Sequence, residues 1–251
     1  MDLKDYFAQN PRAALAFSGG VDSAYLLYAG LHLGAELHPY YVKTQFQPDF
    51  EFRDAMRLCE QLGAEPTVLR LDALEDPMVR RNGPDRCYFC KRRIMGAILE
   101  KAAEDGYSLL LDGTNASDDS GDRPGMRALQ ELKIQSPLRL CGLTKPEIRR
   151  LSKEAGLFTW NKPAYACLAT RVKTGEALEE ETLRRVEAAE DCLGRMGFRD
   201  LRVRTAGGRA TLQFIREQLT EAREREKEIR TGLSGLFDAV EIDPEERKKS
   251  L

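Results

Sequence analysis

Short apolar runs alternate with amphipathic stretches through the first two-thirds of this 251-residue chain. Short apolar runs are typical of buried strands, and apolar residues spaced three and four apart indicate helices. The predicted strands are 13–17, 36–42, 66–71 and 109–111, and the predicted helices are 21–33, 50–62, 90–104 and 145–155. Strands that alternate with helices predict βαβ units, and therefore an α/β fold whose mainly parallel sheet carries helices on both faces.

A different pattern begins after about Arg171, where one long amphipathic stretch is followed by shorter strand-like runs. The predicted order is helix 178–196, strand 201–205, turn 206–208, strand 210–215, helix 217–233 and strand 239–242. This order is typical of a small α+β domain. We therefore expect an α/β domain over residues 1–171 and a second domain over residues 172–251.

Charge and composition narrow the class of protein. The chain has 39 Lys and Arg against 41 Asp and Glu, a net charge of −2, which argues against a broad nucleic-acid surface. No stretch approaches the roughly 20 apolar residues of a membrane span, and no signal peptide is recognisable. We expect a cytoplasmic protein, in which the six cysteines are core residues, metal ligands or catalysts and do not form a disulfide framework.

A glycine-rich turn joins the first predicted strand to the helix that follows it. Its residues are Ser18, Gly19, Gly20, Val21, Asp22 and Ser23. Unpaired N–H groups at a helix start carry partial positive charge, so this turn suits a phosphate group. The Asp22 carboxylate would repel a bare phosphate, which points to Mg²⁺ between them. No Gly-Lys-Ser/Thr follows, so the turn is not a Walker loop.

The turn resembles the pyrophosphate loop of the PP-loop ATP pyrophosphatases, which have an adenine nucleotide alpha hydrolase-like fold and split ATP into AMP and pyrophosphate. The resemblance implies that the adenine lies near the end of the second strand, at 41–44, with Thr44 as the predicted binding residue. The ATP-binding residues predicted after the buried strand 109–111 are Asp112, Gly113 and Thr114. They follow the carboxyl end of that strand, where open α/β sheets bind ligands.

Two cysteines stand three positions apart in Cys87-Tyr88-Phe89-Cys90, at a turn or helix start. Such a pair points both sulfur atoms to one side, as metal chelation or redox pairing requires. Considered alone, Cys167 is a small buried hydrophobe. The remaining cysteines are predicted core residues: Cys59, Cys141 and Cys192.

Several further motifs follow one another along the chain. They are Asp112-Gly113-Thr114-Asn115, Asp122-Arg123-Pro124-Gly125, Ser136-Pro137-Leu138, Gly142-Leu143-Thr144-Lys145 and the segment 160–171. Together with the turn 18–23, they resemble the LarE family of ATP-dependent sulfur transferases over essentially the whole chain. The resemblance implies adenylation of the carboxylates of pyridinium-3,5-biscarboxylic acid mononucleotide and their conversion into thiocarboxylates, during synthesis of the nickel-pincer cofactor of lactate racemase. It also implies a homo-oligomer; the sulfur donor stays unassigned.

The resemblance also assigns the sulfur chemistry, because it identifies Cys167 as the sulfur-bearing residue. Some members of the family have three cysteines that hold a [4Fe–4S] cluster. This sequence has the same pattern, at Cys87, Cys90 and Cys167, and the resemblance implies the same cluster. Three thiolates would leave one iron open for an extra sulfide. The alternative, in which Cys167 gives up its own sulfur, stays open.

Arginines are the candidates for binding the substrate. Arg123 and Arg171 carry the charge needed to neutralise phosphate or carboxylate. Arg202 and Arg204 alternate on one predicted strand and so face the same side. The resemblance implies that such a pair binds the substrate's phosphate.

The resemblance further implies acidic metal-binding positions at Glu190 and Glu221, while Gln213 stands where another acidic residue is expected. Three rival functions remain open. One is a tRNA thiolase of the same superfamily that uses an iron–sulfur cluster, and another is a PP-loop amidotransferase, which would not need three cysteines. The third is a non-enzymatic nucleotide-binding scaffold with a structural metal.

Overall fold

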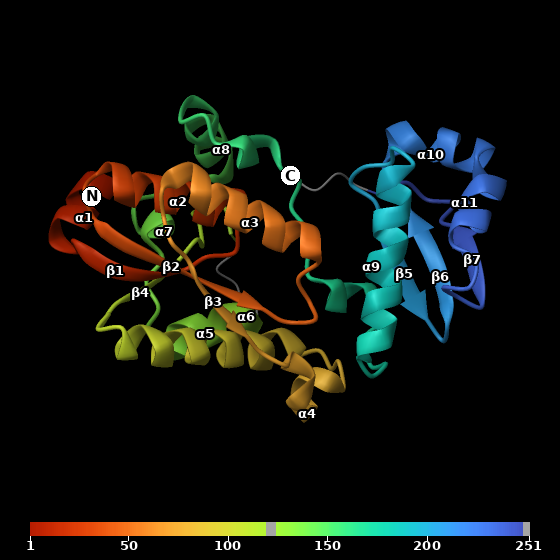
Figure 1. Ribbon diagram of the computed structural model, residues 1–251, viewed down its shortest axis with the longest axis horizontal. Helices are drawn as coiled ribbons and strands as arrows, with labels where there is room; N and C mark the ends of the chain where they lie inside the picture. The colour runs from red at the N-terminus through yellow and green to blue at the C-terminus, as the bar shows by residue number, and fades with distance from the viewer. Residues whose placement is uncertain (119–123, 248–251) are drawn as a thin grey trace. The chain divides into compact units, whose positions relative to one another are not determined.

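The computed structural model describes residues 1–118 and 124–247, and Figure 1 shows the arrangement of their helices and strands. The chain divides into two compact units. Unit 1 comprises Met1–Ala73 and Asp85–Lys162, and unit 2 comprises Leu74–Pro84 and Pro163–Leu251. The sequence boundary after Arg171 therefore differs from the division in the structure.

Backbone hydrogen bonds explain why residues 74–84 belong to unit 2. The carbonyl of Arg80 accepts from Leu178 N at 2.7 Å, and that of Asn82 accepts from Gly175 N at 2.9 Å. The buried Asn82 side chain also donates to the carbonyl of Lys173 at 3.1 Å. These contacts join residues about 90 positions apart, and no local pattern in the sequence announces them.

Unit 1 is built on a four-stranded parallel sheet with the order β3-β2-β1-β4. Its strands are β1 (Arg12–Ala16), β2 (Glu36–Lys43), β3 (Thr67–Arg70) and β4 (Leu110–Asp112). Alternate residues of β1 face opposite cores, with Leu15 in one and Ala14 in the other. The predicted parallel α/β fold is confirmed.

Helices cover both faces of this sheet (Figure 1). One face packs against α1 (Leu3–Gln9), α2 (Val21–His32), α3 (Asp49–Leu62), α7 (Pro137–Leu140) and α8 (Lys145–Glu154). The other face packs against α5 (Arg86–Glu104) and α6 (Pro124–Glu131). Unit 1 is therefore a three-layer α/β/α structure in which β1, β2 and β4 are largely buried, as their apolar sequences require, while the edge strand β3 is only partly buried.

Unit 2 has an antiparallel pair, β5 and β6, extended by a parallel β7. Its elements are α4 (Pro77–Arg80), α9 (Glu180–Arg195), β5 (Arg202–Ala206), β6 (Arg209–Gln213), α10 (Arg216–Glu224), α11 (Glu226–Gly232) and β7 (Ala239–Ile242). Short 3₁₀ helices at Ala73–Glu75, Phe158–Asn161 and Leu168–Arg171 complete the described elements. Unit 2 is thus an α+β fold, as expected.

The single helix predicted at 217–233 is wrong, because α10 and α11 are separated at Arg225. The Arg225 guanidinium donates to Glu221 and Glu228, one on each side of the break, and to the carbonyl of Met196. None of the described helices has the length and apolar character needed to cross a membrane.

Candidate active site

The glycine-rich turn connects β1 to the start of α2 in a closely packed conformation. Gly19 has a φ of +73°, and a Cβ atom there would lie 2.7 Å from Ala55 Cβ. The hydroxyl oxygens of Ser18 and Ser23 are 3.1 Å apart, and Ser23 donates to the carbonyl of Gly20 at 3.2 Å. No side chain of the described residues caps α2, so its first N–H groups are available to an anion.

The end of β4 lies beside this turn. A Cβ atom on Gly113 would lie 2.8 Å from Ser23 N, so only glycine allows the two backbones to approach this closely. Asp112 is buried and accepts from Ser136 Oγ at 2.6 Å and Thr114 Oγ1 at 2.6 Å. Asp112 therefore shapes the loop, and its own oxygens are occupied by neighbouring hydroxyls.

Thr44 follows β2 at the same edge of the sheet, since β2 is the other neighbour of β1. Its hydroxyl donates to Gln47 Oε1 at 2.9 Å, and the side chain is buried. The structure thus brings the turn, the end of β4 and Thr44 to one edge. Their contacts with ATP stay predictions.

Asp22 has a partner that sequence reasoning did not assign. Lys145 Nζ lies 2.5 Å from Asp22 Oδ2, and Asn115 Nδ2 donates to Asp22 Oδ1 at 3.3 Å. Burial raises the pKa of the Asp22 carboxyl, and the Lys145 charge opposes that rise. Lys145 is the first residue of α8, which a capping box between Thr144 and Glu147 fixes in place. In the sequence, only the motif Gly142-Leu143-Thr144-Lys145 could have pointed to Lys145 as a residue of the site.

Cys87 and Cys90 lie in the first turns of α5, which begins at Arg86. Cys87 is exposed and Cys90 is partly exposed. The buried Arg86 guanidinium lies 3.5 Å from Cys87 Sγ. The two cysteines thus stand at one helix start beside a cation, an arrangement compatible with metal ligation by sulfur.

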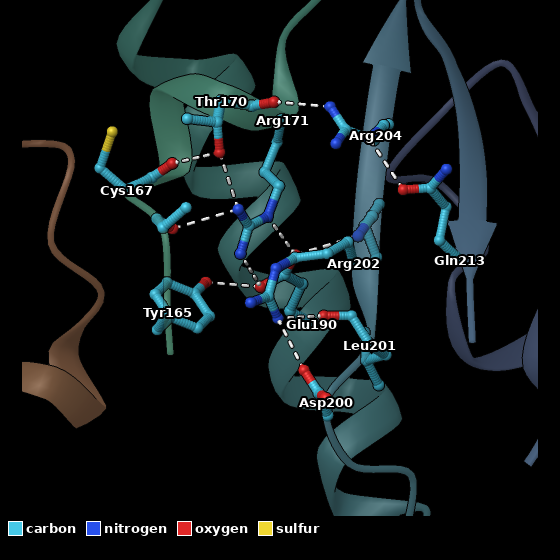
Figure 2. A network of polar contacts seen from close by, with 12 residues as sticks. Tyr165, Cys167, Thr170, Arg171, Glu190, Asp200, Leu201, Arg202, Arg204 and Gln213 are labelled. Atoms are coloured by element: carbon cyan, nitrogen blue, oxygen red, sulfur yellow. Dashed lines mark hydrogen bonds and ion pairs between the residues drawn. The ribbon is translucent and has the colours of Figure 1, made fainter. Parts of the chain in front are cut away.

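Cys167 immediately precedes the 3₁₀ helix Leu168–Arg171 in unit 2 (Figure 2). Its carbonyl accepts from Thr170 N at 2.9 Å and from Thr170 Oγ1 at 2.8 Å. Arg171 Nη1 donates to the carbonyl of Ala166 at 3.1 Å and to Thr170 Oγ1 at 2.8 Å. The backbone is therefore held on both sides of the cysteine.

Glu190 of α9 anchors this arrangement. It accepts from Arg171 Nε at 2.7 Å, from Tyr165 Oη at 2.5 Å and from Val203 N at 2.9 Å. Burial raises the pKa of the Tyr165 hydroxyl far above its ordinary value, and the Glu190 charge adds to the rise. Figure 2 shows these side chains converging between α9, β5 and the Cys167 segment.

The acidic metal site expected at Glu190 and Glu221 is not formed among the residues described. Glu190 is bound as above, Glu221 pairs with Arg225, and Gln213 connects Arg204 with Asp243. More generally, no group of three His, Cys, Asp or Glu side chains in the described part of the chain could hold a metal ion. Cys87 and Cys90 belong to unit 1 and Cys167 to unit 2.

Arg202 and Arg204 both reach the Cys167 segment, as residues on one side of β5 should. The buried Arg202 donates to the carbonyl of Ala164 at 2.8 Å, and burial lowers its pKa to about 10. Arg204 is exposed and donates to the carbonyl of Thr170 at 3.0 Å. Arg123, the remaining arginine predicted to bind substrate, lies outside the described residues.

Comparison with known proteins gives a consistent result, although no family model matches the chain. An uncharacterised protein of Synechocystis sp. is 33% identical over 223 residues, which cover 88% of this chain and 82% of that protein. The pyridinium-3,5-bisthiocarboxylic acid mononucleotide synthase of Lactiplantibacillus plantarum is 35% identical over 195 residues, covering 77% of this chain and 71% of the synthase. The tRNA-specific 2-thiouridylase MnmA of Thermotoga petrophila is 25% identical over 194 residues, covering 60% of this chain and 54% of MnmA.

A parallel sheet with a Ser-Gly-Gly-Val-Asp-Ser turn at α2, together with these relatives, defines an ATP-dependent sulfurtransferase of the PP-loop class. Within that class the similarity to the synthase extends over most of both chains. The chain belongs to the LarE family of sulfur transferases.

Proposed function

We propose that this enzyme adenylates the carboxylates of pyridinium-3,5-biscarboxylic acid mononucleotide and converts them into thiocarboxylates for a nickel-pincer nucleotide. The observation that carries the proposal is the 35% identity to a synthase named for the bisthiocarboxylic product. The closely packed turn at 18–23 supports it, because a phosphate-binding helix start is what adenylation requires.

The first half-reaction uses unit 1. A substrate carboxylate oxygen attacks the α-phosphorus of ATP, the acyl–adenylate forms, and pyrophosphate leaves. The N–H groups at the start of α2 and the hydroxyls of Ser18 and Ser23 bind the departing pyrophosphate. Asp22 supplies a carboxylate for Mg²⁺, which when bound neutralises phosphate charge. Thr44 and the loop 112–114 contact the nucleotide at the same edge of the sheet.

The second half-reaction replaces AMP on the acyl carbon by sulfur. Cys167 anchors the sulfur chemistry of this step, either as a cluster ligand or by giving up its own sulfur, and its clamped backbone supports a role that needs a fixed sulfur position. We propose that Cys87, Cys90 and Cys167 together ligate a [4Fe–4S] cluster. The exposed start of α5 fits a thiolate donor set. When bound, such a cluster would supply a sulfide on the iron without a protein ligand.

Unit 2 is proposed to bind the rest of the substrate and to form the contacts of a homo-oligomer. Arg204 is the exposed member of the arginine pair and is the one we assign to the substrate's phosphate. Arg171 and Arg202, which are both buried, and Arg123 are the other residues proposed to bind the substrate. We place the enzyme in the cytoplasm, where ATP and reduced thiols are available.

Turnover with defined substrates tests the proposal. Purified enzyme with ATP, Mg²⁺, sulfide and the pyridinium biscarboxylate is expected to release pyrophosphate and to yield a product whose mass shows oxygen replaced by sulfur. Transfer RNA in place of the mononucleotide is expected to give neither. Thiolation of the RNA instead would replace the proposed substrate, while leaving the sulfurtransferase class intact.

Spectroscopy tests the proposed metal separately. Enzyme purified without oxygen is expected to contain iron and to show the absorption and, after reduction, the EPR signal of a [4Fe–4S] cluster. A colourless, iron-free enzyme that still transfers sulfur would favour the alternative in which Cys167 gives up its own sulfur.

A further inference from the structure

We propose that Lys145 is a pyrophosphate-binding residue, which Asp22 holds when no nucleotide is bound and releases when Mg²⁺ takes its place. The inference rests on the proposed ATP site at residues 18–23 and adds to it a cation from another helix. Nothing in the glycine-rich turn itself supplies a positive side chain, since its residues are Ser, Gly, Val and Asp.

The geometry places Lys145 at the turn from a rigid support. Its Nζ is 2.5 Å from Asp22 Oδ2, and both side chains are about one-quarter exposed, at 23% and 22%. Its backbone N donates to Ser117 Oγ at 2.9 Å, and the capping box at Thr144 fixes the start of α8. Asp22 is in the first turn of α2, whose N–H groups are the proposed anion site. The Lys145 ammonium group therefore contacts a residue of the helix turn that forms the proposed anion site.

Among the residues that the structure describes, two other cations near Asp22 donate to backbone carbonyls. Arg149, one turn further along α8, lowers the pKa of Asp22 but donates to the carbonyls of Trp160 at 2.7 Å and Lys162 at 2.9 Å. Arg139 donates to the carbonyls of Asn115 at 3.3 Å and Asp118 at 2.5 Å. Both arginines hold the backbone, whereas Lys145 Nζ is held by a carboxylate that the mechanism needs for another purpose.

Charge balance explains why Mg²⁺ could replace Lys145 as the partner of Asp22. In the structure, Lys145 neutralises a carboxylate whose burial disfavours its charged form. A Mg²⁺ ion at Asp22 would take over that function, and a lysine side chain can then rotate to a new partner. The phosphates that enter with Mg²⁺ carry excess negative charge and lie beside it, so the released ammonium would bind them. Lysine commonly binds phosphate in this way, as a point charge.

The exchange predicts opposite effects on two ligands, which a purely structural role would not produce. We would measure by calorimetry the binding of inorganic pyrophosphate with Mg²⁺, and separately of Mn²⁺ alone. Lys145→Met is expected to weaken pyrophosphate binding at least about tenfold. It should tighten Mn²⁺ binding, because the ion no longer competes with an ammonium group for Asp22.

Two further variants make the test specific. Lys101→Met removes a lysine paired with Asp105 at 2.8 Å in the same unit, and should bind both ligands like the wild type. Lys145→Arg keeps the charge and should retain part of the pyrophosphate affinity, which guards against a Lys145→Met variant that unfolds. Equal pyrophosphate binding by Lys145→Met and wild type would overturn the inference alone. A parallel loss of Mn²⁺ binding would also overturn it, and a wild type that binds no pyrophosphate would remove the ATP site as well.

Discussion

Arg171 and Glu190 form a buried ion pair that connects helix α9 to the backbone on both sides of Cys167. Their side chains are 2% and 9% exposed, and Arg171 Nε lies 2.7 Å from Glu190 Oε1. The remaining Arg171 donors reach Ala166 and Thr170, which flank the cysteine (Figure 2). The position of Cys167 is therefore determined by a carboxylate that is not its neighbour in the sequence.

Glu190→Gln is expected to destabilise unit 2 and impair sulfur transfer. The guanidinium of Arg171 would stay buried without a counter-charge, which costs about 3–5 kcal/mol when one partner of such a pair is lost. Pyrophosphate release should fall less than thiocarboxylate formation, because the residues proposed to bind ATP belong to unit 1, whereas Arg171 is proposed to bind the substrate. Chemical denaturation and the two product assays measure these effects.

Glu181→Gln provides the matched control for this experiment. Glu181 is an exposed residue of the same helix, so its replacement should change neither stability nor product formation. If Glu190→Gln transferred sulfur at the wild-type rate, the ion pair would not be needed to position Cys167.

Cys167→Ala is expected to separate the two half-reactions. The variant lacks the sulfur-bearing atom, but its backbone can still accept both hydrogen bonds from Thr170. Pyrophosphate release should therefore survive, while formation of thiocarboxylate stops. Cys192→Ala, in α9, is the control and should retain both activities. Sulfur transfer by Cys167→Ala would show that another residue bears the sulfur.

Gly19→Ala and Gly113→Ala are expected to weaken ATP binding about tenfold or more, about 1.4 kcal/mol. Gly19 combines positive φ with a clash against Ala55, and Gly113 would clash with Ser23 N. Overpacking of this kind costs about 1–3 kcal/mol and would shift the turn. Equilibrium binding of ATP measures the effect.

Gly34→Ala is the control that separates the effect of backbone strain from the effect of a steric clash with a neighbouring segment. Gly34 has a φ of +84°, but a Cβ atom there would meet nothing within 4 Å. The variant should lose about 1–2 kcal/mol of stability through strain alone, with normal ATP affinity. If all three alanine variants bound ATP equally well, the packing of the turn would have no role in nucleotide binding.

The fold could be predicted from the sequence because its elements carry strong local signals. The strand at Arg12–Ala16 differs from its predicted bounds, 13–17, by one residue at each end, and the helix at Val21–His32 differs from 21–33 by one residue at its C-terminal end. Apolar period and glycine turns specify such elements locally. The helix break at Arg225 was missed because its cause is a set of side-chain contacts, including one to Met196, far away in sequence.

The candidate site could be predicted in part. The glycine-rich turn is contiguous, so its residues were identified directly. The partners Lys145 and Glu190 could not be found in this way, since each acts across a long separation on Asp22 or Arg171. Charged residues are common on helix surfaces, and only the folded structure distinguishes the few that are buried in ion pairs.

An exposed and a buried cysteine should differ sharply in their reactivity toward alkylating agents. Cys87 is exposed, whereas Cys59 is buried in the core of unit 1, where burial raises its pKa to about 12. Because the thiolate is the reactive form and Cys87 is accessible, alkylation of iron-free native enzyme between pH 7 and 9 should label Cys87. Cys59 should stay unlabelled over this range and react only after unfolding, as followed by peptide mass spectrometry.

The same labelling tests the three proposed cluster ligands without relying on activity. Reconstitution with iron and sulfide should protect Cys87, Cys90 and Cys167 together, because a thiolate bound to iron cannot attack an alkylating agent. Cys141 and Cys192, which are also partly exposed, should react equally before and after reconstitution and so control for general shielding. If Cys87 and Cys90 became protected while Cys167 kept its reactivity, Cys167 would not be the third ligand. Its sulfur would then have to act without the cluster.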